Sequence, residues 1–474
     1  LVQYMEKKFN VTIVPKFVSW SDFVEKYNLW ATSGELPDFF VTDLRFRSTY
    51  RKWIDQGVIR ALPENLKHYT HLERLINQKD LVYLKESDGK NYFLPRVESK
   101  YDELKRGILV RKDWMENLGI DDPNTWEEFK SMLRKFVAED PNGTGVDDTY
   151  GLVPRTSGFM DTLYLTLFPT LAERGYWFYE NGQWQYPLLA EQMQQVITEL
   201  NLLYREKLLD ADFLLLNTFT AGAEKFAAGN VGALLAQVDP PRLKIAKDLW
   251  EQANPDKDFF ASVKILETYP FPAENGTTYK FTIAPIAWSE TYFNAELSDS
   301  KMDRILNILN FLFSEEGQNI WYRGFEGVDY KLEDGKFIDI RQAGSDGQKV
   351  KIAQKYPSSL FWGGMAYWGN DLTFTNNDEI NYEKFGKGLV DMSRNYIEAL
   401  ATRNAKRPPV DFRVNRIGSK IINEAEIVMS RDDIINESII ADKPWEKFQS
   451  LMQEYLNEGL NDVVTKVNEE LSGL

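Results

Sequence analysis

The amino-acid sequence predicts an α/β fold with at least two domains. Short apolar strands alternate with amphipathic helices along the chain, which is typical of α/β units around a parallel sheet. The chain has 474 residues, whereas one hydrophobic core stops growing at roughly 250–300 residues. No apolar run approaches the roughly 18 residues needed to span a bilayer. The apolar segments are therefore expected to form the cores of folded domains.

The N-terminal part is expected to begin with a helix, because Val2, Met5 and Phe9 have helical spacing. The β-rich run at 11–14 predicts a strand after it. A polar run at 19–22 resembles a capping box for a second helix, which ends at the Gly- and Pro-containing run 33–37. The apolar run 38–41 then predicts a strand, and polar residues follow it directly.

The rest of the chain continues this alternation. We expect strands at 108–110, 150–154, 232–236 and 281–287, and helices that begin at Asp113 and cover 126–137. Three Asp-Gly or Asn-Gly pairs, at 88–89, 181–182 and 334–335, are hairpin-turn signals. Apolar residues at 305, 309 and 312 mark a buried helix face. From Asn377 onward the pattern is mostly helical, with breaks at prolines 408, 409 and 444.

Charge and composition exclude several classes of function. The net charge of −16 would repel a nucleic-acid backbone. The absence of cysteine removes thiol catalysis, disulfides and Cys-ligated zinc. A Ser-His-Asp relay would have to use His68 or His71, the only two histidines; two solvated residues are the simpler interpretation.

Aromatic residues are abundant, with 13 Trp, 23 Tyr and 29 Phe. Core packing accounts for many of them, but thirteen tryptophans are many for a protein without an aromatic ligand. Flat aromatic faces suit the C–H faces of sugar rings, whereas charged and amide side chains suit the hydroxyl groups. Sugar sites combine both kinds of residue.

The loop that begins at Asp140 has the ligand alternation of a calcium-binding loop. Its oxygen donors are expected from Asp140, Asn142, Thr144, Val146 (through its carbonyl) and Asp148. Position twelve is Gly151, where an EF-hand needs a bidentate glutamate, so the loop departs from the EF-hand. Asp147 or Thr149 could supply the missing oxygen. The competing interpretation is a polar Asx-Gly turn without metal.

Several segments, in order, resemble the large extracellular solute-binding proteins (family 1 type) of bacterial ABC importers. The resemblance is closest to the oligosaccharide-binding lipoproteins of Gram-positive bacteria and to the alginate-binding periplasmic proteins. Each segment alone is weak, but together they cover most of residues 1–330. They are Ala31–Asp38, Asp88–Arg96, Val110–Gly119, Trp126–Phe129, Asp140–Leu152 and Arg323–Tyr330.

The resemblance implies a periplasmic-binding-protein type II fold, with two α/β lobes, a hinge and a ligand cleft between the lobes. The expected N-terminal lobe comprises 1–108 and 282–330, and the C-terminal lobe comprises 109–281 and 331–474. Related proteins hold calcium in the loop that matches 140–148, so a structural calcium ion is expected in the C-terminal lobe. Family members usually begin with a strand; this strand and a preceding lipobox or signal are expected to be missing here.

The function implied by the resemblance is capture of an oligosaccharide by hinge closure and delivery to the permease subunits of an ABC transporter, without catalysis. The implied location is the surface of a Gram-positive cell, as a lipoprotein, or the periplasm. The chain is expected to be a monomer that would reach the membrane only through a lipid anchor removed from this sequence. The identity, length and charge of the sugar stay open.

Candidate ligand contacts come from strand ends and from aromatic residues that look exposed. The N-terminal lobe is expected to contribute Trp20, Asp43, Arg45, Arg96, Trp288 and Glu326. The C-terminal lobe is expected to contribute Gln237, Asp239, Trp362, Tyr367 and Trp368. For each aromatic residue the alternative is core packing, and for Asp43 with Arg45 it is an ion pair within the lobe.

Two other functions stay open at this point. A glycoside hydrolase would also use tryptophans, together with two carboxylates at a suitable separation, and 72 acidic residues make some such pair inevitable. No acid/base motif supports this interpretation. The third interpretation is a surface module that binds polysaccharide.

Overall fold

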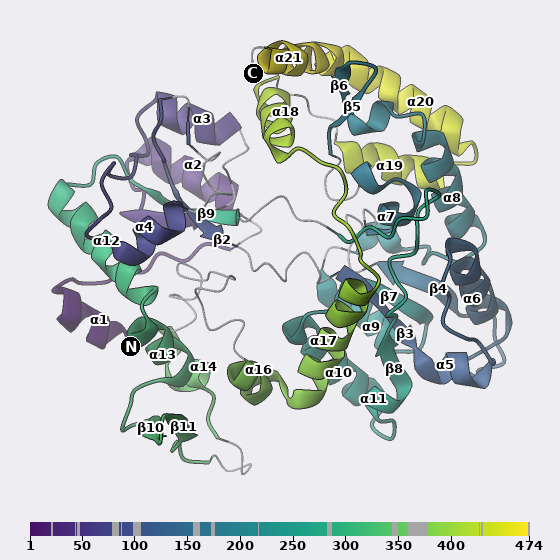
Figure 1. Cartoon of the computed structure of the whole chain (residues 1–474), viewed down its shortest axis with the longest axis horizontal. Coiled ribbons are helices and arrows are strands. Elements are labelled where there is room, and N and C mark those ends of the chain that lie inside the picture. The colour runs from purple at the N-terminus through teal and green to yellow at the C-terminus, as the bar shows by residue number, and fades with distance from the viewer. Residues whose placement is uncertain are drawn as a thin grey trace. The chain divides into compact units, whose positions relative to one another are not determined.

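The structure is a computed structural model that describes residues 1–19, 22–42, 44, 48–77, 85–86, 88–97, 106–154, 162–171, 176–216, 218–281, 287–343, 349–358, 378–425, 427 and 430–472. The chain forms two compact units, each built from two stretches of sequence (Figure 1). Unit 1 comprises Leu1–Lys100 and Pro285–Ile380, and unit 2 comprises Tyr101–Ala284 and Asn381–Leu474. No helix in the described part is long and apolar enough to cross a membrane.

Unit 1 is built around a three-stranded sheet with the order β1-β9-β2. The central strand β9 pairs antiparallel with both neighbours, so β1 and β2 run in the same direction. Buried residues of α4 and α12 and of the sheet, such as Leu72, Leu306 and Phe40, form one core. The elements of unit 1 are α1 (Val2–Phe9), α2 (Phe23–Ser33), β1 (Phe39–Thr42), α3 (Ser48–Asp55), α4 (Thr70–Ile76), β2 (Leu94–Val97), β9 (Ala287–Phe293), α12 (Asp299–Leu312), α13 (Glu315–Arg323), β10 (Tyr330–Glu333), β11 (Lys336–Asp339) and α14 (Ile352–Lys355).

Unit 2 is built around a four-stranded sheet with the order β4-β7-β3-β8. Its elements are β3 (Arg106–Arg111), α5 (Lys112–Asn117), α6 (Trp126–Ala138), β4 (Tyr150–Pro154), α7 (Tyr164–Leu167), β5 (Phe178–Glu180), β6 (Gln183–Gln185), α8 (Met193–Arg205), α9 (Phe219–Ala227), β7 (Val231–Gln237), α10 (Pro240–Ala253), α11 (Phe259–Ser262), β8 (Val263–Ile265), α17 (Lys387–Thr402), α18 (Phe412–Glu424), α19 (Arg431–Ile440), α20 (Pro444–Tyr455) and α21 (Asn461–Ser472). The helix α16 (Asp378–Phe385) contains the sequence boundary between the two units.

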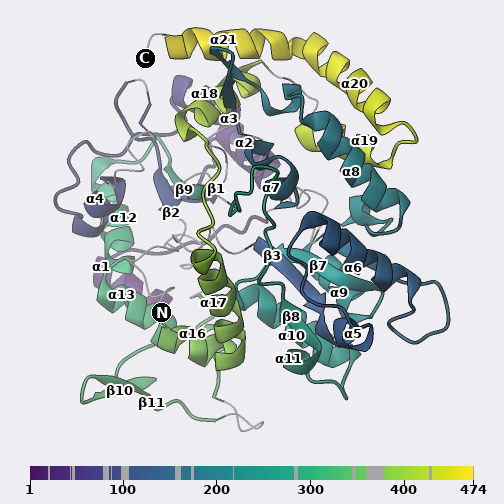
Figure 2. The ribbon, with the colours of Figure 1, turned by 45° about the vertical axis from the view of Figure 1, so that its right-hand side comes forward.

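Both faces of the unit 2 sheet are covered by helices, because neighbouring residues of a strand point to opposite faces. Ile108 and Val110 of β3 belong to the core that includes α6 and α8, whereas Leu109 belongs to the core that includes α9, α10 and α17. The strand β3 is therefore a continuous apolar run, as a strand buried on both faces must be. Figure 2 shows this sheet among its helices.

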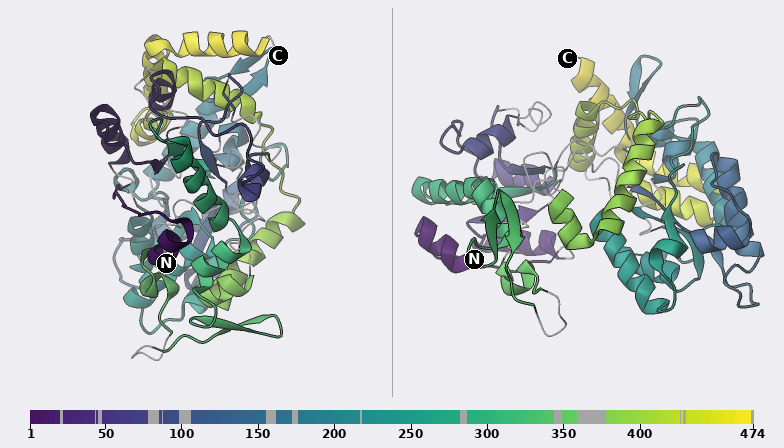
Figure 3. Two further views of the ribbon diagram at one scale, coloured as in Figure 1. Left: turned by 90° about the vertical axis from the view of Figure 1, so that its left-hand side faces the viewer. Right: turned by 60° about the horizontal axis from the view of Figure 1, so that its bottom comes forward.

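The C-terminal helices complete the first of these two cores. Figure 3 shows α20 and α21 in yellow at the end of the chain, and their buried residues Phe448 and Val463 join those of α6 and α8. The side chain of Asn468 in α21 also donates to the carbonyl of Trp184 and accepts from its N–H, both at 2.8 Å. The predominantly helical pattern predicted after Asn377 is confirmed in the part of that segment described.

Two of the three predicted hairpins form. Asn181-Gly182 joins β5 to β6, and Asp334-Gly335 joins β10 to β11. All four turn residues have positive φ, as a type I′ turn requires. The third signal, Asp88-Gly89, forms a turn closed by a hydrogen bond from Gly89 N–H to the Glu86 carbonyl, without a strand pair in the described residues beside it.

The prediction of a strand at 11–14 is wrong. The structure has no regular element at 11–19, because this segment has no neighbouring strand to pair with among the described residues, and an unpaired strand is not stable. Residues 282–286 of the predicted strand 281–287 lie outside the described residues, and the described strand β9 covers Ala287–Phe293. Trp288 is therefore inside a strand, where it was expected after one.

The expectation of a parallel sheet is wrong for most pairs. Among the described strands only β4 and β7 pair in parallel, whereas β7 and β8 both pair antiparallel with β3. Strands that are neighbours in these sheets come from distant parts of the chain. Their directions are therefore not set by consecutive β-α-β crossovers.

The predicted lobes differ from the observed units in two places. The N-terminal lobe was expected to extend to residue 108, but Arg106–Arg111 pairs with β7 and belongs to unit 2. Residues after 330 were expected in the C-terminal lobe, but the β10–β11 hairpin belongs to unit 1. The hairpin stays there because Ile340 N–H bonds the Asp329 carbonyl and Lys355 pairs with the Asp329 carboxylate.

Candidate functional site

One edge of the unit 1 sheet brings together two of the predicted ligand residues. The carboxyl ends of β1 and β2 lie at the same edge as the beginning of β9, because β9 is antiparallel to both. Arg96 of β2 pairs with Ser289 of β9, next to Trp288. The structure therefore brings the backbones of Arg96 and Trp288 together. Trp20, Asp43 and Arg45 lie outside the described residues.

A buried glutamate that the sequence reasoning missed supports this edge. Glu290 of β9 is fully buried, and its Oε1 accepts hydrogen bonds from the Leu44 N–H at 2.5 Å and from the Tyr292 hydroxyl at 2.8 Å. The carboxylate thereby holds the backbone N–H of Leu44, two residues after the end of β1. The signal in the sequence was an acidic residue inside the strand pattern Ala287–Phe293, because such a residue stays buried only when it is hydrogen-bonded.

The matching edge of unit 2 lies at the end of β7. Gln237 pairs with Arg106 at the beginning of β3, and Asp239 follows two residues later. The Asp239 Oδ1 accepts from the Arg242 N–H at 3.0 Å and caps α10. Its Oδ2 is buried and has no hydrogen-bond partner among the described residues. Asp239 therefore has a structural role at least through Oδ1, which sequence reasoning did not anticipate.

Arg106 is a second residue that sequence reasoning missed. Its guanidinium lies over the ring of Phe281, 3.7 Å from the ring centre, and its Nη1 donates to Thr162 Oγ1 at 3.2 Å. The Tyr396 hydroxyl donates to the Arg106 carbonyl at 2.7 Å. A planar cation with several donors beside an aromatic ring has the chemistry that binds hydroxyl groups. No sequence motif marked it, because the register of β3 against β7 had to be known first.

Of the remaining predicted ligand contacts, only Glu326 belongs to the described residues, and it does not lie at either sheet edge. Glu326 is exposed in the turn between α13 and β10 of unit 1. Trp362, Tyr367 and Trp368 lie outside the described residues.

A separate hollow of about 390 Å³ lies at the other end of the unit 1 sheet. It is lined by Arg60, Tyr69 and Asp303 among others. The Arg60 N–H bonds the Phe293 carbonyl at the end of β9, whereas the candidate edge is at the beginning of β9. This hollow is therefore not the candidate ligand site.

The Asp140 loop brings its predicted oxygen donors together in unit 2. The Thr144 Oγ1 lies 3.2 Å from Asn142 Oδ1, 3.5 Å from the Val146 carbonyl and 3.2 Å from Asp148 Oδ1. The Asp140 carboxylate accepts from the N–H groups of Thr144 and Gly145. The loop thus brings oxygens of Asn142, Val146 and Asp148 close to Thr144 Oγ1, whereas the Asp140 carboxylate is held by backbone N–H groups of the same loop. Oxygen donors with partial negative charge are the ligands that calcium prefers.

The structure also tests the missing ligand at position twelve. Gly151 lies in β4, where a Cβ would come within 2.8 Å of the Leu208 carbonyl oxygen and 2.9 Å of Leu133 Cβ. No side chain fits there. Asp147 pairs with Lys207 at 2.8 Å, and the Thr149 hydroxyl donates to the Phe136 carbonyl at 2.8 Å. The two substitutes expected from the sequence are therefore engaged elsewhere in this structure.

The oxygen donors of this loop can be compared with what a calcium ion takes. Calcium takes six to eight oxygens, and affinity rises with the number of charged ligands and with rigidity. This loop offers two carboxylates and three neutral oxygens. No cluster of three or more His, Asp or Glu side chains that could hold a metal occurs in the described residues, so the loop is a candidate only if neutral oxygens complete the ligand set.

A family model matches this chain over most of its length. The model for the bacterial extracellular solute-binding proteins covers residues 1–319. Lipoprotein LipO of Bacillus subtilis (strain 168) is 26% identical over 364 residues, which are 72% of this chain and 65% of LipO. The fructooligosaccharide ABC transporter substrate-binding protein FusA of Streptococcus pneumoniae serotype 4 is 29% identical over 161 residues, 31% of this chain and 29% of FusA. The matches span less than two thirds of either relative.

Solved structures share the fold of almost the whole chain. The alginate-binding protein AlgQ2, solved without calcium ion, has a TM-score of 0.72 at 16% identity and covers 99% of this chain and 93% of its own. FusA in complex with kestose has a TM-score of 0.65 at 16% identity, with 99% and 94% covered. This likeness confirms the two-lobe α/β fold that the sequence predicts. Together with the family model it identifies the chain as a member of the bacterial extracellular solute-binding proteins.

Proposed function

We propose that this protein is the substrate-binding component of an ABC importer that captures an oligosaccharide and delivers it to membrane permease subunits. The observation that carries this proposal is the family match over residues 1–319. The name of one relative states that it binds fructooligosaccharides for an ABC transporter. The fold likeness to AlgQ2 and to FusA with kestose supports the same class of ligand.

In this proposal the protein binds its ligand without breaking a bond. Substrate-binding relatives are not enzymes, and they favour capture over the glycoside hydrolase alternative. The edge residues of each unit supply the contacts. Arg96 and Trp288 would act in unit 1, and Arg106, Gln237 and Asp239 would act in unit 2. The hinge closure implied by the resemblance stays a prediction, and small-angle scattering with and without sugar would test it.

A panel of neutral and acidic oligosaccharides tests the proposal by isothermal titration calorimetry. We expect saturable binding of at least one sugar, with the sugar recovered intact by chromatography after long incubation. Release of shorter sugars would contradict the proposal and favour a glycoside hydrolase. The variant Arg106→Met keeps an apolar contact with Phe281 but removes every donor, so it should weaken binding while the variant stays folded.

We also propose that the Asp140 loop binds calcium as a structural ion. Asp140, Asn142, Thr144, Val146 and Asp148 would hold it, and water would complete the coordination. The ion would neutralise two carboxylates and tie the end of α6 to the beginning of β4. The approach of the Asn142, Val146 and Asp148 oxygens to Thr144 Oγ1 supports this proposal.

For the location, we propose the outside of a bacterial cytoplasmic membrane. The family consists of extracellular proteins, and one relative is a lipoprotein. A lipid anchor upstream of Leu1 and a monomeric state are part of this proposal. Mass spectrometry of the protein isolated from its native membrane tests the anchor, and light scattering tests the monomer.

A further inference from the structure

The end of α17 and the turn after it, residues 396–406, contact both stretches of chain that bring Arg106 and Phe281 together in unit 2. Arg106 begins β3, and Phe281 lies well beyond the end of β8. The guanidinium of Arg106 lies over the ring of Phe281, 3.7 Å from the ring centre. A cation is attracted to an aromatic face, but this attraction does not set where the two backbones lie. The position of the pair therefore depends on contacts that each stretch makes elsewhere.

Tyr396 of α17 holds the backbone of Arg106. Its side chain is fully buried, and its hydroxyl donates to the Arg106 carbonyl at 2.7 Å. The same ring packs on the next residue, because a Cβ on Gly107 would come within 3.2 Å of Tyr396 Cζ. The missing side chain at 107 gives the ring room to lie against the beginning of β3. A residue of the C-terminal stretch thus fixes the backbone from which the Arg106 side chain extends.

Arg403, which directly follows α17, holds the loop after β8. Its Nη1 donates to the carbonyls of Thr268 and Pro270, at 2.6 and 2.9 Å. Its Nη2 donates to the Tyr269 carbonyl at 2.8 Å. One guanidinium therefore binds three consecutive carbonyls, which its rigid planar set of donors allows. The backbone at 268–270 is held in one place by this single side chain.

The loop that Arg403 holds reaches the Arg106 guanidinium through Thr162. The Tyr269 hydroxyl donates to the Thr162 carbonyl, and Thr162 Oγ1 accepts from Arg106 Nη1 at 3.2 Å. Tyr269 and Thr162 are both fully buried, so the interior around them has little room to rearrange. A shift of the carbonyls at 268–270 would therefore move an acceptor of the guanidinium.

The turn after α17 also fixes the stretch that ends at Phe281. The Lys406 N–H donates to the Thr278 carbonyl, and the Lys280 N–H donates to the Lys406 carbonyl, both at 2.9 Å. These bonds form a short parallel bridge directly before Phe281, whose ring is buried. The ring is thereby attached to the same segment that holds the arginine.

We propose that Tyr396 and Arg403 are positioning residues, which hold the Arg106 guanidinium over Phe281 in the geometry that binds sugar. This inference rests on the proposed function, in which Arg106 contacts an oligosaccharide. Neither Tyr396 nor Arg403 touches the sugar; both act through Arg106. A set of donors that is already held in place loses less conformational entropy on binding than one that the ligand must order. The affinity for sugar therefore depends on residues 396–406.

A double-mutant cycle separates positioning from a purely structural role. Tyr396→Phe removes one hydroxyl and keeps the buried ring, and Arg403→Met keeps an aliphatic chain without donors. Calorimetry with a sugar that binds the parent should show about fivefold weaker affinity for each variant. In an Arg106→Met background the same substitutions should change the affinity by less than about twofold, because the group that they position is gone. No loss in the parent, or equal losses in both backgrounds, would overturn the proposal.

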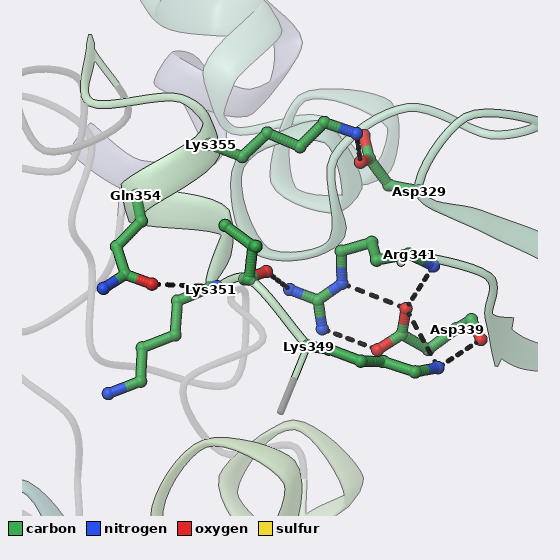
Figure 4. Close-up of polar contacts among 8 residues, drawn as sticks. Asp329, Asp339, Arg341, Lys349, Lys351, Gln354 and Lys355 are labelled. Atoms are coloured by element: carbon green, nitrogen blue, oxygen red, sulfur yellow. Dashed lines mark hydrogen bonds and ion pairs between the residues drawn. The ribbon is translucent and has the colours of Figure 1, made fainter. Parts of the chain in front are cut away.

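Tyr455→Phe and Arg341→Met are the matched controls. The Tyr455 hydroxyl is buried against the Tyr186 hydroxyl at 3.3 Å. Arg341 of unit 1, like Arg403, donates to a backbone carbonyl, that of Val350 at 2.8 Å (Figure 4). Both substitutions remove the same kind of group elsewhere, so they should shift the denaturant midpoint but leave the affinity for sugar unchanged. Losses of affinity as large as those of the Tyr396 and Arg403 variants would contradict the positioning role.

A measurement without sugar keeps this inference apart from the proposed function. NMR of the nitrogen-labelled, ligand-free protein detects the Arg106 Nε–H, which is assigned by its absence in Arg106→Met. Its chemical shift should change in Tyr396→Phe and in Arg403→Met and stay unchanged in both controls. A resonance that does not move in either variant would overturn the positioning role. Absence of sugar binding in the parent would instead contradict the proposed function, and the NMR result would still decide whether the two residues position Arg106.

Discussion

At the scale of single residues, two buried carboxylates in unit 1 have separate tasks. Glu290 fixes the backbone after β1, and Asp329 fixes the turn before β10. Neither was expected from the sequence. Residue identity alone does not reveal which of 72 acidic side chains is buried, because burial depends on the strand register and on partners far away in the sequence.

Asp329 should make stability depend on pH. Burial alone would raise the pKa of Asp329, but hydrogen bonds from Lys355, the Phe325 N–H and Tyr356 outweigh burial and hold the pKa below its ordinary value. A depressed folded pKa stabilises the protein above the unfolded pKa of about 3.9. This stability is lost as the pH falls through the folded pKa.

The variant Asp329→Asn should therefore lower the free energy of unfolding at neutral pH by about 1–3 kcal/mol. The difference from the parent should shrink as the pH is lowered below 4, because the parent carboxylate then becomes neutral too. Urea unfolding at several pH values measures both effects. Asp334→Asn, an exposed position in the same hairpin, is the control and should stay within about 0.5 kcal/mol. A pH-independent difference would contradict this account of Asp329.

The variant Glu290→Ala should weaken sugar binding by about tenfold, because the buried Leu44 N–H loses its acceptor next to the carboxyl end of β1. Glu290→Gln retains an acceptor oxygen and should bind nearly as the parent does. Calorimetry with a sugar that binds the parent measures both variants. Equal losses in the two variants would show that the negative charge matters rather than the hydrogen bond to Leu44.

At the scale of elements, local patterns predicted α1, α2, α5, α6, α12 and two hairpins, but not the helices α8, α9 and α10. The helix 126–138 starts where Thr125 accepts from the Glu128 N–H at 3.2 Å, and both type I′ turns use the Asn-Gly or Asp-Gly pair that the sequence shows. The prediction of a strand at 11–14 is wrong because β propensity does not form a strand without a partner strand. The prediction of parallel strands is wrong for most pairs because strands that are neighbours in the sheets are distant in the chain.

The Asp140 loop gives a prediction at this scale. Adding EGTA should lower the melting temperature of the parent, because removing a ligand that binds only the native state removes its stabilisation. The double variant Asp140→Asn, Asp148→Asn should melt at the same temperature with and without EGTA, since two of the five donors lose their charge. Scanning calorimetry in matched buffers, with magnesium as a control, measures this shift. An unchanged melting temperature of the parent after addition of EGTA would argue against bound calcium.

Gly151 gives a second prediction about the same loop. The variant Gly151→Ala should lower the free energy of unfolding by about 1–3 kcal/mol, because its Cβ would press on the Leu208 carbonyl and on Leu133. Denaturant unfolding of the calcium-free protein measures this cost apart from any effect of metal. An unchanged unfolding midpoint would show that β4 and its neighbours can separate at no cost.

At the scale of the whole molecule, the family resemblance carried more information than any single motif. It gave two lobes with discontinuous sequence and the sugar-capture hypothesis before the structure was considered. It misplaced residues 101–108 and 331–380 because their lobe depends on pairing with β7 and on the contacts of Asp329. Of the predicted ligand residues, six lie outside the described residues, and Arg96, Trp288, Gln237 and Asp239 lie at the two sheet edges.

The most direct test of the central claim is calorimetric titration of the intact chain with a panel of oligosaccharides, with chromatographic analysis of each sugar afterwards. The account predicts saturable binding of at least one oligosaccharide, one ligand per chain, and recovery of that sugar intact. Binding should fall in Arg106→Met. Cleavage of the bound sugar would contradict this account. Full sugar affinity in both single variants, Arg106→Met and Glu290→Ala, would also contradict it.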